Sequence, residues 1–249
     1  MRKRVRFLYV VFLVSGLLMS LMFVIERFGP TLVSVAERST ETFSTEIAAF
    51  KARDARSGFR ADAILFVGSA DFKLWRDMEA RFAPRPIINR GFGGAHLRHV
   101  LRYYDDVVKV YKPRALVIYA GENDIAASVK PGVVLGDFDK LMNKVRADFP
   151  AMPVLVVSLK PSPLRFDDLA VQLEVNEGIK QRTSHDDNLY YVDVVTPMLQ
   201  AGDQGISDSL FVADQLHLTK EGYDIWAREI GWHFDRLFGR IELGPVDRG

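Results

Sequence analysis

The 249-residue chain contains no cysteine. This absence excludes disulfides, thiolate catalysis, zinc sites built on cysteine and a lipid anchor on cysteine, but it leaves the compartment open, because reducing and oxidising environments both accept such a chain. Neither sign of charge is in excess, with 33 lysines and arginines against 32 aspartates and glutamates, so there is no overall electrostatic case for nucleic acid as a partner. A lysine-containing phosphate loop is also lacking, and "GFGGAH" does not have the spacing of a dinucleotide fingerprint.

One long stretch, Phe7 to Ile25, carries no charge. At about 1.5 Å per residue, a helix of this length spans roughly the 30 Å core of a bilayer. Four basic residues precede it, namely Arg2, Lys3, Arg4 and Arg6, and they favour a cytoplasmic N-terminus. We expect residues 1–27 to be an uncleaved signal anchor in the inner membrane, with the rest of the chain in the periplasm. The alternative is a cleaved signal peptide, for which the small-residue site Ser34-Val35-Ala36 comes late.

Residues 28–60 are expected to form an amphipathic stalk helix followed by a hinge. Apolar side chains recur there at helical spacing, namely Leu32, Val35, Ala36, Phe43, Ile47 and Phe50. The simplest partner for this apolar face is the globular domain itself. The alternatives are a second copy of the chain, which would give a homodimer, and the membrane surface. The stretch "KARDARSGFR", residues 51–60, is interpreted as the hinge.

Strand-like and helix-like segments alternate over residues 61–240. The apolar runs "AILFVG", "PIINRG", "ALVIYAG", "PVLVVSLK" and "LYYVDV" are typical of strands. Helices are expected over Ala95 to Val110, Val134 to Phe149, Leu169 to Arg182 and Lys220 to Phe238. The alternation predicts one domain, a three-layer α/β/α sandwich with a mostly parallel sheet of about five strands, followed by a C-terminal tail over 241–249.

Ligands of such sheets bind at the carboxyl ends of the strands, and the loops that follow three of the predicted strands are unusual. They are Gly68 to Asp71, Asn89 to His96 and Ala120 to Ala126, and a fourth loop near the C-terminus holds Asp214 and His217. A histidine three residues after a carboxylate can accept a proton while the carboxylate fixes its tautomer. The alternative is a structural histidine.

Two further residues strengthen the catalytic interpretation. A glycine N–H at Gly94 and the side-chain amide of Asn123 can both donate to an oxyanion, and each such donor commonly contributes about 2.7–4 kcal/mol to transition-state stabilisation. Taken singly, the glycines are better explained by a flexible turn and Asn123 by a helix cap. A metal site at His96 and His99 is disfavoured because no third ligand is evident.

The four loops, in this order, resemble the conserved blocks of the SGNH hydrolases, also called GDSL-type esterases and lipases. The resemblance extends from about Ala63 to Trp226 and implies the flavodoxin-like fold of that family. It places the catalytic aspartate and histidine at Asp214 and His217. Two oxyanion donors fall on Gly94 and Asn123, and a third is the backbone N–H at position 70. The nucleophilic serine should lie two residues after Gly68, but the chain has Ala70 there.

Ala70 admits two main explanations. Either serine has been replaced to give an inactive variant of an esterase, or the protein is a natural pseudoenzyme that binds an envelope glycan or a protein partner. The joint presence of the other site residues favours the first. Ser69 as a displaced nucleophile is a third, weaker option, because a shift of one residue would aim its side chain elsewhere.

The resemblance implies a serine ester hydrolase without metal or organic cofactor, acting on acyl and preferably acetyl esters of small molecules or envelope carbohydrate. Ser69, Glu122 and Lys160 are assigned to substrate binding, the last because "KPSP" follows the fourth predicted strand. A polysaccharide O-acyltransferase is the remaining alternative, because it would use the same triad.

Overall fold

The structure is a computed structural model that describes residues 43–60, 62–202 and 205–240. The chain divides into two compact units, Met1–Ala49 and Phe50–Gly249, and the second contains almost all of the described residues. The predicted membrane anchor, the start of the stalk and the C-terminal tail lie outside the described residues. Within the described ranges, no helix is both long and apolar enough to cross a membrane.

A sheet of five parallel strands forms the centre of the second unit, in the order β2-β1-β3-β4-β5. The strands are β1 (Ile64–Gly68), β2 (Ile87–Gly91), β3 (Ala115–Tyr119), β4 (Val154–Val157) and β5 (Leu189–Val192). β1, β3 and β4 are buried along their whole length, as strands are when helices cover both faces. All five coincide with the apolar runs identified in the sequence.

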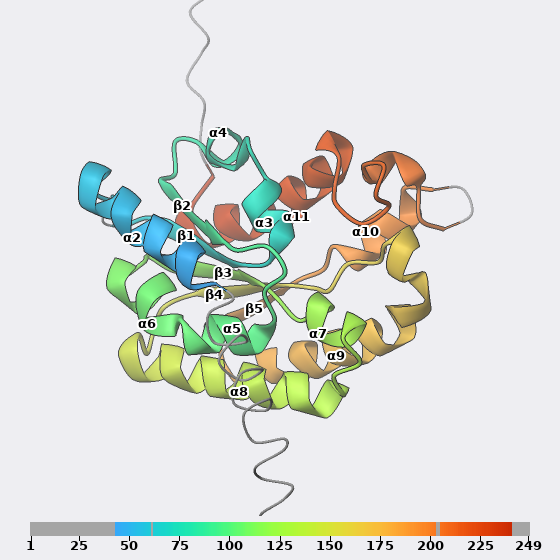
Figure 1. Cartoon of the computed structure of the whole chain (residues 1–249), viewed down its shortest axis with the longest axis horizontal. Helices are drawn as coiled ribbons and strands as arrows, with labels where there is room; N and C mark the ends of the chain where they lie inside the picture. The colour runs from blue at the N-terminus through green and yellow to red at the C-terminus, as the bar shows by residue number, and fades with distance from the viewer. Residues whose placement is uncertain (1–42, 61, 203–204, 241–249) are drawn as a thin grey trace, which may run out of the picture. The chain divides into compact units, whose positions relative to one another are not determined.

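Helices cover both faces of the sheet (Figure 1). One layer contains α5 (Leu97–Arg102), α6 (Tyr104–Val107), α8 (Pro131–Asp148) and α9 (Leu169–Thr183), and the other contains α3 (Ala70–Leu74), α4 (Met78–Phe82), α10 (Val195–Gln200) and α11 (Lys220–Phe238). Short segments complete the connections, namely η1 (Lys109–Tyr111), α7 (Glu122–Ala126), η2 (Pro163–Asp168) and η3 (Asp208–Leu210). The prediction of a three-layer α/β sandwich with a parallel sheet is confirmed.

Two expectations about helices are wrong in detail. The single helix expected over 95–110 is broken at Tyr103, whose φ of −92° and ψ of 13° lie outside helical geometry, so the segment forms α5, α6 and η1 instead. The hinge expected over 51–60 is helical up to Ser57, where α2 (Ser44–Ser57) ends. Asp54 in this helix binds both Arg90 and Tyr111, so a tertiary contact holds the segment in place.

The ends of β1, β2 and β3 lie at the same level of the sheet. Gly68, the last residue of β1, pairs with Gly91 on one side and with Tyr119 on the other. A side chain at position 68 would place its Cβ 1.9 Å from the carbonyl oxygen of Tyr119, so only glycine fits there. The chain reverses its direction of winding between β1 and β3, and this switch point is where doubly wound sheets bind ligands.

Aromatic packing joins the last helix, α11, to the turn after β1. Tyr223 stacks on Trp75 with ring centroids 4.8 Å apart, and its hydroxyl donates to the carbonyl oxygen of Asp71 at 2.8 Å. Trp226 contacts Tyr119 at a centroid distance of 4.7 Å. These contacts fix the loop that precedes α11 close to the carboxyl end of β1, although the two are far apart in sequence.

Candidate active site

The turn after β1 carries Ala70 at the start of α3. Ala70 is the first partly exposed residue after the buried strand β1. The preceding residue, Ser69, is the N-cap of α3, and its hydroxyl oxygen accepts a hydrogen bond from the Ala70 N–H at 2.6 Å. Ser69 is only 3% exposed. A hydroxyl buried in this way is poorly placed to attack a substrate, which argues against Ser69 as the nucleophile.

Asp214 and His217 form the pair expected from their spacing. His217 Nδ1 lies 2.6 Å from Asp214 Oδ2, while the backbone N–H groups of Leu216 and His217 both donate to Asp214 Oδ1 at 2.9 Å. Desolvation is the largest single influence and opposes ionisation, but the hydrogen bonds from His217 and Leu216 together outweigh it and lower the pKa of Asp214 to about 2. Asp214 is therefore a carboxylate at neutral pH, able to orient the imidazole and to stabilise it when it is protonated.

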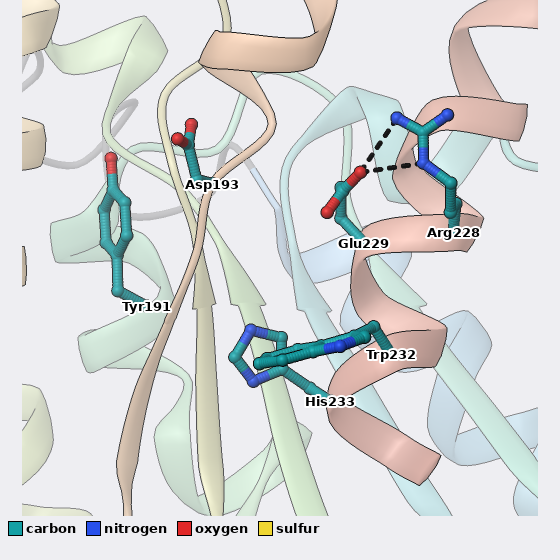
Figure 2. Close-up of a pocket in the computed structure, with 6 residues that line it drawn as sticks. All are labelled: Tyr191, Asp193, Arg228, Glu229, Trp232 and His233. Carbon is teal, nitrogen blue, oxygen red and sulfur yellow. Dashed lines mark hydrogen bonds and ion pairs between the residues drawn. The ribbon is translucent and has the colours of Figure 1, made fainter. Parts of the chain in front are cut away.

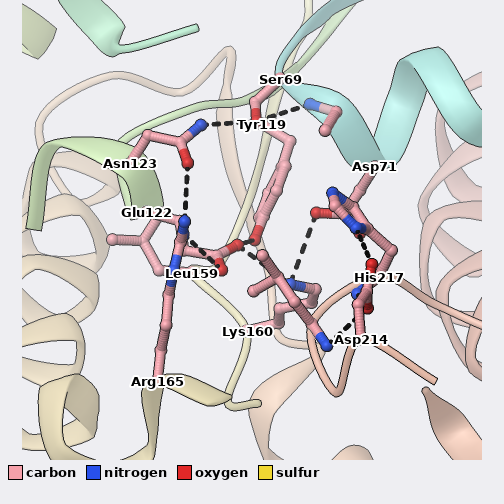
Figure 3. A network of polar contacts seen from close by, with 12 residues as sticks. Ser69, Asp71, Tyr119, Glu122, Asn123, Leu159, Lys160, Arg165, Asp214 and His217 are labelled. Carbon is pink, nitrogen blue, oxygen red and sulfur yellow. Dashed lines mark hydrogen bonds and ion pairs between the residues drawn. The ribbon is translucent and has the colours of Figure 1, made fainter. Parts of the chain in front are cut away.

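The Asp214–His217 pair lies near the Ala70 turn. His217 lies close enough to the buried carboxylate of Asp71, the residue directly after Ala70, for the two side chains to interact electrostatically. Figure 3 draws the two side chains in the same part of the site. Leu164 in η2 also donates its N–H to the carbonyl oxygen of Gln215, which ties the histidine loop to the segment after β4. The sequence separation of about 150 residues is thus closed by the packing of α11 and η2.

Asn123 presents its amide to the same turn. Its Nδ2 donates to the Ser69 hydroxyl oxygen at 3.0 Å and to the carbonyl oxygen of Ala95 at 3.1 Å. Its Oδ1 accepts from Arg165 Nη2 at 3.1 Å. Since arginine only donates, it identifies the amide atom facing it as the oxygen, and the amide N–H groups consequently face the turn.

Ser69 Oγ accepts hydrogen bonds from both Ala70 N–H and Asn123 Nδ2. These are two of the three donors assigned to the oxyanion hole, so they converge on one small region beside residue 70. The third, Gly94, lies in the loop after β2 with φ of 79°, a conformation that favours glycine. Asp124 holds that loop against α7 by accepting from the Leu97 N–H at 3.0 Å.

A buried charge network lies beneath these donors (Figure 3). Lys160 Nζ is 3.0 Å from Glu122 Oε2 and 3.4 Å from Asp71 Oδ2, and Glu122 also binds the Tyr119 hydroxyl and Arg165 Nη1. Burial is the largest influence on Asp71 and raises its pKa to about 6, while nearby Lys160 and Arg165 hold the pKa of Glu122 below its usual value despite burial.

This network changes the role of two residues that the sequence assigned to substrate binding. Lys160 is 0% exposed and Glu122 is buried, so their charges bind each other rather than lying open to a substrate. Arg165 was not singled out in the sequence at all. Nothing in its local pattern marks it, because its two partners, Glu122 and Asn123, are more than 40 residues away.

His96 and His99 serve as helix caps. The His96 N–H donates to His99 Nδ1 at 3.0 Å at the start of α5. In the part of the chain that the structure describes, no group of three metal-ligating side chains comes together.

Comparisons with known proteins identify the family and the fold. The family model described as GDSL-like lipase/acylhydrolase matches residues 58–225. A GDSL-like lipase from Bacteroides thetaiotaomicron has a similar structure, with 20% identity and a TM-score of 0.65 over 77% of this chain and 98% of its own. At such low identity this likeness shows a shared fold. No curated protein sequence matches the chain.

Two further solved structures of similar fold are serine-to-alanine mutants of esterases. An acetylxylan esterase from Geobacillus stearothermophilus, solved as a serine-to-alanine catalytic mutant, has 15% identity and a TM-score of 0.57 over 69% of this chain and 93% of its own. A serine-to-alanine mutant of an acetyl esterase, solved with an acetate ion, has 17% identity and a TM-score of 0.54 over 70% and 97%. Because the family match extends over most of the sequence, the chain belongs to the GDSL-like lipase/acylhydrolase family, that of the SGNH hydrolases.

Proposed function

We propose that the protein is an ester hydrolase of the Ser-His-Asp type whose nucleophilic serine is replaced by Ala70 in this chain. Two observations support this proposal. Ala70 N–H and Asn123 Nδ2 converge on one point, the Ser69 hydroxyl oxygen, and the ionised Asp214 holds His217. A pocket that only bound a ligand would have no need of a histidine oriented by a carboxylate.

The reaction follows from the geometry once serine stands at position 70. His217 takes the proton of the serine hydroxyl as its oxygen attacks the ester carbonyl, and the negative charge moves to the carbonyl oxygen. Asn123, Gly94 and the residue-70 N–H stabilise this oxyanion. His217 then protonates the departing alcohol, which leaves an acyl-enzyme. Water, deprotonated by His217, attacks the acyl-enzyme to release the acid and restore the serine.

Acetyl esters of envelope carbohydrate are the proposed substrates. Two proteins of similar fold are named as an acetylxylan esterase and an acetyl esterase, which supports an acetyl group. The uncharged run Phe7 to Ile25 supports an inner-membrane anchor with the domain in the periplasm, and the stalk offers a route to a homodimer. The proposed natural pseudoenzyme remains the second candidate, favoured by Ala70 itself.

Product analysis distinguishes hydrolysis from acyl transfer. The Ala70→Ser variant would be incubated with an acetyl ester donor and an unacetylated oligosaccharide, and the products measured by mass spectrometry. We expect free acetate in stoichiometric amount with the consumed donor and no acetylated sugar, because water completes the second step. Acetylated oligosaccharide as the main product would identify a transferase instead.

Arg165 is expected to act on catalysis by positioning Asn123. In the Ala70→Ser background, Arg165→Met removes the donor that fixes the amide, so Oδ1 and Nδ2 can exchange places and the oxyanion loses part of its stabilisation. We expect kcat to fall roughly 10- to 100-fold, with little change in KM. This decrease should not exceed the decrease caused by removing a whole oxyanion donor.

A double-mutant cycle separates positioning from a general structural effect. Once Asn123→Ala has removed the amide, adding Arg165→Met should lower kcat little further. If the two losses instead multiply in full, or if the loss appears in KM and in the melting temperature alone, Arg165 does not position the amide.

A further inference from the structure

A cavity lies at the open edge of the sheet, between β5 and α11. It has a volume of about 600 Å³. Its lining residues are Tyr191, Asp193, Arg228, Glu229, Trp232 and His233, and Figure 2 shows them on the strand and on the helix that face each other. None of them belongs to the site around Ala70. The cavity is therefore a separate feature that acyl transfer leaves unexplained.

Trp232 forms the apolar surface of this cavity. Its side chain is 53% exposed, whereas the other two tryptophans, Trp75 and Trp226, are 2% and 0% exposed. Figure 2 shows the indole nearly edge-on, so that one of its faces is turned toward the space bounded by Asp193 and Glu229. A single exposed aromatic residue needs no explanation by itself, but this one presents a flat face to a cavity.

Polar groups surround that face. Arg228 and Glu229 are paired at 2.8 to 2.9 Å, and Asp193 accepts hydrogen bonds from the Thr196 N–H and hydroxyl. The rim thus offers both donors and acceptors, with the arginine charge already balanced by a carboxylate.

The balance of charge favours a neutral ligand. Asp193 and Glu229 are acidic, and Arg228, the arginine of the lining, is already paired with Glu229. Arg236 lies outside the lining, 4.6 Å from the centre of the Trp232 ring. Burial also lowers the pKa of His233 to about 4, so this imidazole is uncharged at neutral pH. An anion would meet the two carboxylates, and Arg236 would repel a cation stacked on the indole.

We propose that this cavity binds one sugar ring of a neutral polysaccharide, as a site separate from the acyl-transfer centre. A pyranose has an apolar face of C–H groups that packs on an aromatic ring, and a rim of hydroxyls that both donate and accept hydrogen bonds. Trp232 matches the face, and Asp193, Glu229 and Arg228 match the rim. The site would hold the protein on a glycan independently of ester cleavage.

Tryptophan fluorescence tests this proposal on the full chain as it stands. Because Trp232 is the exposed tryptophan, acrylamide should quench it in preference to the two buried ones. The probes would be β-linked hexasaccharides of xylose, glucose and N-acetylglucosamine, none of which carries an ester. We expect at least one of them to give a saturable change in fluorescence and to protect Trp232 from acrylamide.

Matched variants locate the binding, with affinity measured by calorimetry so that the loss of a fluorophore does not matter. Trp232→Ala should weaken binding at least tenfold, and Trp232→Phe, which keeps a smaller ring, should weaken it less. His217→Ala in the other site should leave the affinity unchanged. Because none of the probes contains an ester, failure here does not bear on the proposed hydrolysis.

Three results would overturn the proposal. The first is no saturable binding of any of the three hexasaccharides. The second is binding that Trp232→Ala leaves intact while circular dichroism shows both proteins folded. The third is self-association, measured by sedimentation, that Trp232→Ala abolishes, since the cavity would then be a contact between copies of the chain.

Discussion

Replacing Ala70 by serine should create esterase activity, with a rise in kcat/KM of roughly 10³- to 10⁶-fold on a short acyl ester such as p-nitrophenyl acetate. Alanine and serine differ by one hydroxyl, and Ala70 is partly exposed at the start of α3, so the turn has room for the added atom. The orienting carboxylate and the oxyanion donors are already in place. The present chain should show only the residual rate that donors and binding supply without a nucleophile.

His217→Ala in the serine variant provides the control for this prediction. It should return the rate to that of the present chain, which distinguishes triad chemistry from a contaminating esterase. If Ala70→Ser folds normally but remains inert on acetyl esters, longer acyl esters and acetylated glycans, the hydrolase proposal fails. The pseudoenzyme alternative would then take its place, and the pocket should be assayed for ligand binding.

Lys160→Met should destabilise the protein by roughly 3–5 kcal/mol, because it leaves buried carboxylates without their cation. Lys160 lies between Asp71 and Glu122 and has no exposed surface. Glu122 would retain Arg165, whereas Asp71 would lose its ion-pair partner. Urea denaturation followed by circular dichroism measures the free energy of unfolding.

The loss of stability in Lys160→Met should depend on pH, and the protonation of Asp71 sets the direction of this dependence. Burial already raises the pKa of Asp71 to about 6, and a protonated carboxyl has no need of a cation. The deficit of Lys160→Met should therefore be smallest below about pH 6 and should grow as the pH rises through that value.

Lys140→Met is the matched control for this variant. Lys140 pairs with Asp137 on α8 at 2.8 Å, but its side chain is 66% exposed, and such pairs contribute only about 0–1 kcal/mol. Equal effects of the two substitutions would show that the buried network does not stabilise the fold.

The sequence by itself determined the layers of the fold and was enough to name the candidate site residues. Each of the five strands is a short run of β-branched and aliphatic residues, and such local periodicity depends only on neighbouring residues. The Asp214–His217 pair was predictable for the same reason, since three residues separate its members. Asn123 and Gly94 could be named because the short segments that hold them, each directly after a strand, resemble blocks of the SGNH hydrolases.

The tertiary structure alone decided what surrounds these residues. Arg165 reaches Asn123 and Glu122 from a distant loop, and Lys160 has both of its carboxylates on other segments, so no local pattern marks either residue. Trp232 is not marked by a local pattern either. Its place in a helix is compatible with an exposed or a buried side chain, and only the packing of α11 beside β5 puts it at the cavity. Burial and long-range hydrogen bonds are properties of the packed chain. They decide whether a charged side chain is open to substrate or is paired inside the protein, where it stabilises the site.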